Sequence, residues 1–324
     1  MDKILITGAE GYIGKCLFYF LKKKFDVIGI DKKKSLEKKI FQCNITNQNK
    51  LDLIISKEQP KIIIHLAAQS LVDDTINKKK YYANNVLATN TLLKVMKNHN
   101  IKKIIFSSTA TVYNQSSRLL TEKSKVKPLS SYAKTKLVCE NNIKKQKKIK
   151  SIILRFFNVC SALNKPIIGV SNNPITHFIP TVVYKAIYNK KIYIYGNDYS
   201  TPDGTCIRDY IHILDICDVI EKSIKHLNEN NKSRIFNIGN NRGLSNKEII
   251  NYIKKFINPK INISYVHRRN GDASKLVCSL IKVKSLLKWK PKHSNLKKIL
   301  NDELNWVKKL KRIGLKRTFK NYLQ

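Results

Sequence analysis

The chain has 324 residues, of which 42% are hydrophobic, so it is long enough to bury a large core and longer than the usual single domain. Its formal charge of +41 comes from 63 lysines and arginines against 22 acidic residues, and lysines make up most of the excess. Because the lysines are spread over every segment and form no stripe with aromatic residues, we interpret them as a solvated surface and expect no specific nucleic-acid partner, with an adventitious affinity for polyanions as the alternative.

The cysteines and the apolar runs disfavour further classes of protein. The seven cysteines are an odd number, are widely scattered and include no C-x-x-C pair, which argues against disulfides and against a zinc site. No apolar run reaches the roughly 20 residues that cross a bilayer, and glycines interrupt the N-terminal segment where a signal peptide would have its apolar core. We therefore expect a cytoplasmic protein with no membrane partner. Since the histidines have no partners at metal-ligand spacing, we expect no metal site either.

The first predicted elements, in residues 3–14, are a strand, a glycine turn and the start of a helix. Gly8, Gly11 and Gly14 form G-x-x-G-x-x-G at this junction. Glycines allow the backbone to turn tightly and to approach a pyrophosphate, whose charge then meets the free amides of the helix N-terminus. The pattern therefore predicts a dinucleotide site.

An acidic residue completes the predicted dinucleotide site. Asp31 ends the next predicted strand, residues 25–31, where its carboxylate suits an adenosine ribose and repels a 2′-phosphate. This position favours NAD over NADP, although a run of lysines follows it. Glu10 lies inside the glycine turn, and since a carboxylate near a pyrophosphate costs Coulomb energy, we expect its side chain to point to solvent.

Further strands alternate with helices through the first half of the chain. A helix is predicted at residues 85–98, where apolar residues from Val86 to Met96 share one face. Apolar strands separated by helices are typical of an α/β fold with a doubly wound parallel sheet of the Rossmann type. The remaining predicted strands lie at residues 61–68, 102–113 and 149–158.

Three residues behind the strand at 102–113 predict acid–base chemistry. Tyr132 and Lys136 are four residues apart, so on a helix they address the same ligand. A phenol has a pKa of about 10, and a nearby ammonium and a nicotinamide cation both favour its ionised form; lowering that pKa by about 3 units corresponds to about 4 kcal/mol. Thr109, where the strand ends, supplies a hydroxyl that can hold a substrate oxygen or relay its proton.

From about residue 159, clusters of proline and glycine predict a loop-rich second half. Because no linker separates the halves, we expect a smaller second lobe that packs directly on the first. We predict an NAD-binding Rossmann domain at residues 1–165. Residues 166–324 are expected mainly to bind the substrate, with some segments returning to the Rossmann sheet.

Six motifs occur in order along the chain: TGAEGYIG, FSSTATVY, SYAKTK, LRFFN, GNDYSTPDGTCIRDYIH and RRNGD. In them the chain resembles the extended short-chain dehydrogenase/reductases, and within these the UDP-glucose (UDP-galactose) 4-epimerases, over essentially its whole length. The resemblance implies an isomerase of galactose metabolism that acts on nucleotide-sugars, binds NAD tightly, binds its UDP-hexose in the second lobe and forms a homodimer. Related nucleotide-sugar 4,6-dehydratases carry an Asp-Glu pair where this chain has Ala110 and Thr111, which weakens that reading.

The resemblance also implies roles for individual residues. Tyr132 is the base that removes the proton of the sugar 4′-hydroxyl, Lys136 binds the nicotinamide ribose and tunes the tyrosine, and Thr109 is the family's hydroxyl residue. The 4-keto sugar then turns over and regains hydride on its other face. The implied cofactor-binding residues are Gly8, Gly11, Tyr12, Ile13, Gly14, Asp31, Asn44, Ile45, Leu66, Ala67, Ala68, Asn85, Ser107, Tyr132, Lys136 and Phe157.

A second set of residues is implied for the UDP-sugar. Arg208 and Arg269 suit the diphosphate because a forked guanidinium can bind a pair of phosphate oxygens. The alternatives are a local ion pair between Arg208 and Asp209, and a core position for Tyr195. The implied substrate-binding residues are Thr109, Asn158, His177, Phe178, Tyr193, Tyr195, Arg208, Tyr210, Arg269 and Asp272.

Other functions compete with the 4-epimerase. Leu276 aligns with the position that limits room for the sugar's 2-substituent, and leucine leaves UDP-GlcNAc and UDP-GalNAc open as substrates. A dehydratase or decarboxylase of the same superfamily would change the mass of the sugar, whereas an epimerase would not. An inactive dinucleotide-fold protein that binds nucleic acid is a different class, and the intact set of Thr109, Tyr132 and Lys136 argues against it.

Overall fold

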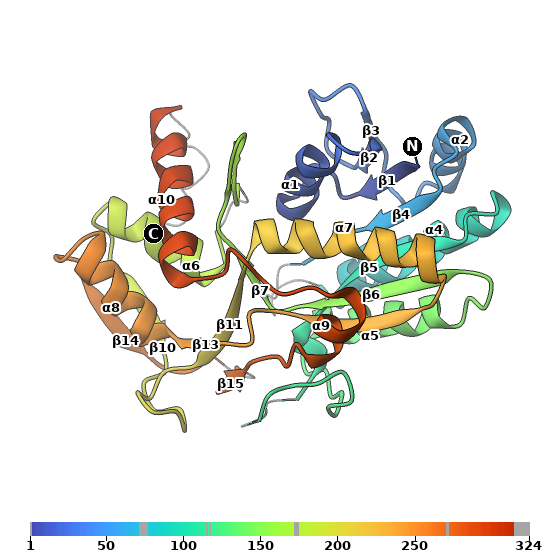
Figure 1. Ribbon diagram of the computed structural model, residues 1–324. Coiled ribbons are helices and arrows are strands. Elements are labelled where there is room, and N and C mark those ends of the chain that lie inside the picture. The colour runs from blue at the N-terminus through green and yellow to red at the C-terminus, as the bar shows by residue number, and fades with distance from the viewer. Residues whose placement is uncertain are drawn as a thin grey trace.

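The core of the protein is a seven-stranded parallel sheet, seen in a computed structural model whose described residues are 2–70, 77–114, 116, 118–171, 175–269 and 272–313 (Figure 1). The strand order β3-β2-β1-β4-β5-β6-β12 reverses direction of winding between β1 and β4, which is where doubly wound sheets bind ligands. The predicted fold class is therefore confirmed. The strands are β1 (Lys3–Thr7), β2 (Asp26–Asp31), β3 (Ile40–Gln42), β4 (Ile62–His65), β5 (Lys103–Thr109), β6 (Lys150–Phe156) and β12 (Arg234–Ile238).

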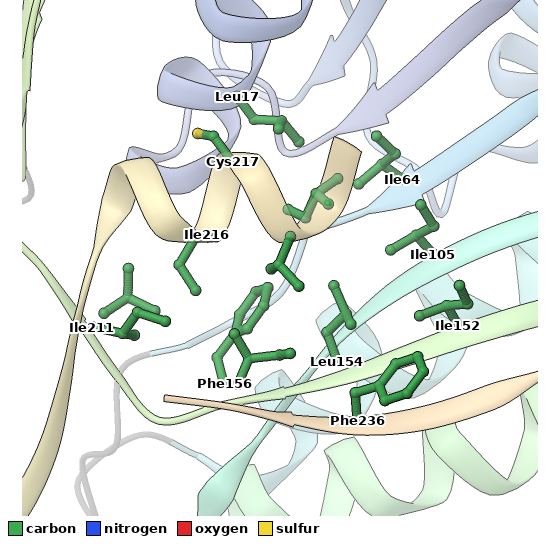
Figure 2. Close-up of a cluster of buried hydrophobic side chains, with 14 of the residues drawn as sticks. Leu17, Ile64, Ile105, Ile152, Leu154, Phe156, Ile211, Ile216, Cys217 and Phe236 are labelled. Carbon is green, nitrogen blue, oxygen red and sulfur yellow. The ribbon is translucent and has the colours of Figure 1, made fainter. Parts of the chain in front are cut away.

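Helices cover both faces of this sheet, so its strands are mostly apolar. On one face, Leu17 and Ile216, which come from two different helices, belong to one buried cluster with strand residues such as Ile105 and Leu154 (Figure 2). The helices on that face are α1 (Tyr12–Leu21) and α7 (Ile213–Asn230), with α9 (Ile281–Leu287) beside β12; on the other face lie α2 (Gln48–Glu58), α4 (Ala88–Asn98) and α5 (Ser131–Lys144).

The helix predicted at residues 85–98 differs from the prediction at its start. Val86 and Met96 are buried as expected. However, α4 begins only at Ala88, and it is preceded by the π-helix η1 (Tyr82–Leu87) and by the short helix α3 (Lys78–Tyr81). A π-helical turn contains an extra residue, and such turns often occur at functional sites. Here it carries Asn85.

A second lobe packs around its own apolar core, in which Ile179, Val183, Ile249 and Trp306 are buried. Its helix α8 starts with a capping box, because the Ser245 hydroxyl accepts from the Glu248 amide while the Glu248 carboxylate accepts from the Ser245 amide. The lobe consists of α6 (Phe178–Ile187), α8 (Asn246–Phe256), α10 (Leu296–Arg312), β10 (Ile192–Tyr195) and β14 (Ile263–Val266).

Short strands lie between the large sheet and this lobe (Figure 1). The central one, β11, pairs with three partners, and β7 follows β6 almost directly along the chain. In the described part of the chain no helix combines the length and the apolar character that crossing a membrane requires. The remaining elements are β7 (Asn158–Cys160), β8 (Leu163–Asn164), β9 (Ile167–Ile168), β11 (Ile207–His212), β13 (Gly243–Ser245), β15 (Lys275–Leu276) and the 3-10 helix η2 (Ala110–Val112).

Candidate active site

The glycine turn between β1 and α1 is packed too tightly for other residues. Gly8 has a φ of +74°, and a Cβ added to it would lie 2.8 Å from the Ala67 amide nitrogen. A Cβ on Gly14 would lie 2.0 Å from the carbonyl oxygen of Gly8. Since both contacts are with backbone atoms, no side-chain movement could relieve them. The turn therefore requires glycine at both positions.

The first amides of α1 have no side-chain cap. Its N-cap is Gly11, which has no side chain to satisfy the first amides, and no acidic residue lies in the first turn. By contrast, Asn47, Ser130 and Asn295 cap α2, α5 and α10 with side-chain oxygens. Amides left open at a helix N-terminus, next to close-packed glycines, fit the pyrophosphate of a dinucleotide.

Asp31 and Glu10 meet beside this turn. The Asp31 carboxylate accepts hydrogen bonds from the amides of Glu10 (3.0 Å) and Lys33 (2.9 Å), which leaves lone pairs for a ribose. The expectation that Glu10 points to solvent is wrong, because its side chain is only 12% exposed. It binds Lys15 Nζ at 2.9 Å and Ser35 Oγ at 2.5 Å. The ammonium offsets the charge of the carboxylate, so the residue is tolerated near an anion site.

The other residues implied for the cofactor follow the strands of the same parallel sheet, at its carboxyl edge. Asn44 is exposed after β3, whereas the Ile45 side chain is buried in the core, so only its backbone can face a ligand. The Ala67 amide donates to Thr7 Oγ1 at 3.3 Å. Tyr12 donates to the Ser161 carbonyl at 2.6 Å. Ile13, Leu66 and Ala68 are half-buried, and Phe157 is buried after β6.

The predicted base lies at the start of α5. Ser130 caps this helix, and the Tyr132 hydroxyl shares a hydrogen bond with Thr109 at the end of β5. Burial raises the pKa of Tyr132 to about 12, and the hydrogen bond with Thr109 lowers it. The sequence predicted a lowered pKa in the presence of both an ammonium and a nicotinamide cation, and the protein groups around Tyr132 do not by themselves lower it. The reason is that desolvation of the phenolate outweighs the interactions that stabilise it.

Lys136 lies one turn further along α5 and is only 2% exposed. Its Nζ atom is 4.1 Å from the centroid of the Phe106 ring. Burial lowers the pKa of Lys136 to about 8, and the charge of Glu140 is among the groups that raise it. The ammonium form therefore still prevails at neutral pH, in a nearly dry position that faces the Tyr132 side of the helix.

His65 at the end of β4 is a neutral neighbour of this lysine. Burial and the charge of Lys136 lower the pKa of His65 to about 3. Its two ring nitrogens are hydrogen-bonded to the hydroxyls of Thr7 (2.7 Å) and Thr89 (3.0 Å). Ser107, one of the implied cofactor residues, donates to the His65 carbonyl at 3.1 Å. The wall beneath Lys136 is thus polar but uncharged.

Asn85 ties the segment after β4 to the tyrosine helix. Its side-chain oxygen accepts from the Gln69 amide at 2.7 Å, and its amide group donates to Thr135 Oγ1 at 2.9 Å. Thr135 in turn donates to the Tyr132 carbonyl at 2.8 Å. The structure therefore places Asn85 as a support for Tyr132, with its side chain already engaged by the protein.

Part of the implied substrate set gathers around β11. Asn158 of β7 stands opposite Tyr210 of β11. Arg208, nearly buried, donates to Asp272 at 3.2 Å. The alternative ion pair with Asp209 is wrong, since the Asp209 carboxylate instead accepts from backbone amides, among them those of residues 240 and 278. The forked arginine remains beside β15, with donors to spare for an anion.

The rest of that set lies on the second lobe. The Arg269 guanidinium stacks 3.8 Å from the centroid of the Tyr195 ring, and Tyr195 is 36% exposed, so the alternative of a core tyrosine is wrong. Tyr193 shares that face of β10 and is also exposed. His177 is the N-cap of α6, which no side chain caps, and Phe178 is its first residue. Residues 270 and 271 of the RRNGD motif lie outside the described residues.

Three buried polar residues around the site were missed by the sequence reasoning. Ser108 and Arg155 both donate hydrogen bonds to the carboxylate of Glu140. A signal was present, because Arg155 interrupts an apolar strand and Glu140 lies four residues after Lys136. Among the described residues, no three His, Cys, Asp or Glu side chains are grouped to hold a metal.

A glycine turn at the switch point of a parallel sheet, with an acidic residue after the second strand, defines a dinucleotide-dependent class of enzyme. The chain belongs to the NAD dependent epimerase/dehydratase family, whose model matches residues 4–239. The predicted dependence on NAD is thereby confirmed.

Named relatives narrow the similarity within this family. A UDP-glucose 4-epimerase of Halalkalibacterium halodurans is 34% identical over 321 residues, covering 94% of this chain and 95% of the relative. A crystal structure of a UDP-glucose 4-epimerase superposes with a TM-score of 0.90 at 35% identity, covering 95% and 98% of the two chains. The UDP-glucose 4-epimerase from Brucella ovis in complex with NAD has a TM-score of 0.89 at 28% identity, covering 94% and 98%. The resemblance drawn from the motifs is confirmed.

Proposed function

We propose that the protein interconverts UDP-galactose and UDP-glucose at C4 of the sugar, with Tyr132 as the base. The observation that carries the proposal is the buried Lys136 one helical turn from a tyrosine whose hydroxyl binds Thr109. The named relatives support the substrate, since they are UDP-glucose 4-epimerases that match this chain over nearly their full length.

The proton steps are assigned to this chain's own side chains. Tyr132 takes the proton of the sugar 4′-hydroxyl and later returns it, while Thr109 holds the phenol by its hydrogen bond. Bound NAD⁺ supplies the hydride acceptor, the returning hydride and a positive charge. One opposite charge at about 4–6 Å lowers a pKa by about 1–3 units, so a phenol that starts near 12 needs more than one to ionise near neutral pH. The Lys136 ammonium provides another.

The residues that would hold NAD fit its three charged or polar parts. The open amides at the N-terminus of α1 suit the pyrophosphate, and Asp31 suits the adenosine ribose. Lys136 suits the nicotinamide ribose, because it lies with Tyr132 on one face of α5. We assign the other implied cofactor-binding residues, which follow the strands of the sheet, to the walls of this site.

The UDP group is assigned to the second lobe. Arg208 and Arg269 would bind the diphosphate, and the stacking of Arg269 on Tyr195 keeps its guanidinium edge free for hydrogen bonds. The contact between Arg208 and Asp272 holds that arginine in place before the anion arrives. Of the two predicted domains, residues 1–165 then serve the cofactor and residues 166–324 mainly the sugar nucleotide.

The test is incubation of the purified protein with UDP-galactose and no added cofactor, followed by separation of the UDP-hexoses. We expect UDP-glucose of unchanged mass. Tyr132→Phe should keep the fold and bound NAD while turnover falls by at least about a thousandfold. A dehydrated or decarboxylated product would favour the other enzymes of the superfamily, and full turnover by Tyr132→Phe would reject the base.

We also propose a cytoplasmic homodimer. All seven cysteines are free and buried, as suits a reducing compartment. Tyr82, Leu87 and Val138 are 51%, 45% and 40% exposed on η1 and α5, and a second copy would cover them. Light scattering should give twice the chain mass of 37.5 kDa, and Val138→Glu should halve it. Leu53→Glu, at a position of α2 that is 70% exposed, is the control that should leave the dimer intact.

A further inference from the structure

A fully enclosed ion pair stands behind the catalytic residues. Glu140 of α5 is 0% exposed and Arg155 of β6 is 3% exposed. The guanidinium binds the carboxylate with two parallel bonds, from Nε to Oε1 at 2.9 Å and from Nη2 to Oε2 at 2.6 Å. The Ser108 hydroxyl donates to the same carboxylate at 2.5 Å. Side chains from three elements, α5, β5 and β6, thus meet at one carboxylate.

Glu140 lies on the same face of α5 as the residues proposed to carry the reaction. Tyr132, Lys136 and Glu140 follow one another at intervals of four residues, so they lie along one face of α5. Ser108 immediately precedes Thr109 on β5. The hydrogen bond between Glu140 and Ser108 therefore joins the helix that carries the base to the strand that carries its hydroxyl partner.

The pair continues into the segment that follows Thr109. Arg155 Nη1 donates to the Tyr113 hydroxyl at 2.8 Å, and Tyr113 donates to Asn237 Oδ1 of β12 at 2.7 Å. Asn237 donates from its side chain to the Leu120 carbonyl at 3.0 Å. Movement of the ion pair would consequently disturb hydrogen bonds at Ser108 and Tyr113, on either side of Thr109, and at Asn237 of the edge strand β12.

We propose that Glu140 is a positioning residue for the reaction: held by Arg155 and Ser108, it fixes α5 against β5 and sets the place and the charge of Lys136 beside Tyr132. The inference rests on the proposed function, because it assumes that Lys136 and Tyr132 act on the cofactor and the sugar. Glu140 itself touches neither.

The electrostatic part of this role follows from the groups that face Lys136. Cys139 and Glu140 face it from α5 and His65 from β4, with the uncharged ring of Phe106 on β5. His65 is neutral, so Glu140 is the anion that offsets burial of the ammonium. Replacing Glu140 by Gln removes that anion and leaves Arg155 as an unpaired cation nearby. Both changes lower the pKa of Lys136 further.

A merely structural ion pair would behave differently. Buried pairs can often be replaced by neutral residues without loss of stability, and a pair that only joins α5 to β6 would then be dispensable. Replacing such a purely structural pair would leave the titration midpoint of Lys136 unchanged. The titration midpoint of Lys136 and the balance between kcat and KM therefore distinguish a positioning role from a structural one.

The test compares Glu140→Gln with Glu221→Gln. Glu221 on α7 is a matched control, because it too is a buried glutamate with a basic partner. That partner is Lys24, at 2.8 Å, and Glu221 lies outside the site. Protein labelled with ¹³C at the lysine ε-carbons reports Lys136 directly, because the Phe106 ring should shift its signal away from those of exposed lysines. Loss of that signal in Lys136→Arg assigns it.

For Glu140→Gln we expect the Lys136 midpoint, and the alkaline limb of kcat with it, to move about one pH unit lower. At neutral pH the shifted titration alone should lower kcat about twofold, and loss of the anchor between α5 and β5 should lower it further, while KM for UDP-galactose stays within about twofold because the UDP contacts are elsewhere. Glu221→Gln should show neither change. An unchanged midpoint and an unchanged kcat in folded Glu140→Gln overturn the proposal.

A second variant covers failure of the first to fold. The double change Glu140→Gln with Arg155→Gln leaves neither a carboxylate nor a guanidinium unpaired, and it should fold yet keep part of the lowered midpoint and of the reduction in kcat. A double variant with wild-type kcat and midpoint would contradict the positioning role. If the wild-type protein lacks epimerase activity, the proposed function fails instead, whereas the titration of Lys136 still tests the link to Glu140.

Discussion

Gly11 and Gly14 lie at the start of α1, and replacing each by alanine should have a different effect. Gly14→Ala should reduce stability, whereas Gly11→Ala should reduce NAD binding. At Gly14 the new Cβ would lie 2.0 Å from the Gly8 carbonyl oxygen and 2.9 Å from the Ala9 Cα, so backbone must move. Overpacking of this kind costs about 1–3 kcal/mol or more, offset by about 1 kcal/mol of helix propensity. Because the blocking atoms are backbone, the upper end of this range applies, and we expect Gly14→Ala to lower the free energy of unfolding by about 2 kcal/mol.

At Gly11 the new Cβ would meet only the Gly8 carbonyl, at 3.1 Å, and φ of −72° suits alanine. Loss of glycine at an N-cap costs about 1 kcal/mol at most. The methyl group would, however, stand at the open amides assigned to the pyrophosphate. We expect Gly11→Ala to remain nearly as stable as the wild type while it retains much less NAD.

Two measurements on the same preparations separate these outcomes. Urea unfolding at unchanged m-value gives the difference in stability, and release of NAD from denatured protein gives the bound cofactor per chain. Because bound NAD also stabilises the native state, unfolding is compared with the cofactor removed from all samples. Gly11→Ala with full NAD content would refute the assignment of the anion site to these amides.

Three further outcomes are expected. Turnover should decline as pH rises through about 8, since the lowered pKa of Lys136 means that its ammonium is lost there and not near 10; constant kcat up to pH 10 would contradict this. Arg208→Lys should raise KM for UDP-galactose about tenfold with little change in kcat, because an ammonium lacks the second parallel hydrogen bond, and equal KM values would remove Arg208 from the diphosphate site. Arg155→Met should lower the free energy of unfolding by about 3–5 kcal/mol, measured by urea titration, because it strands the buried Glu140 carboxylate; a loss below about 1 kcal/mol would show that the carboxylate is not held as an ion.

The parts of the site that could be predicted from the sequence are those fixed by local spacing. The strand, glycines and helix around Gly8 to Gly14 are contiguous, and the interval between Tyr132 and Lys136 needs only a helix. The role of Arg155 could not be predicted, because its partner lies on α5 and the pairing of β5 with β6 brings them together. Likewise, nothing local reveals that Lys15 and Ser35 would hold Glu10.

Burial explains the largest difference between expectation and structure, and it also gives the site its logic. It raises the pKa of Tyr132 and lowers that of Lys136, so both side chains are biased toward their neutral forms. Positive charge near the phenol is therefore needed to overcome this bias. The charge of Glu140 helps to keep Lys136 as an ammonium at neutral pH, because it raises the pKa that burial lowers. A base that ionises only when sufficient positive charge surrounds it will not take a proton before its ligands are in place. The same carboxylate that anchors α5 thus also determines the pH range over which the tyrosine can act.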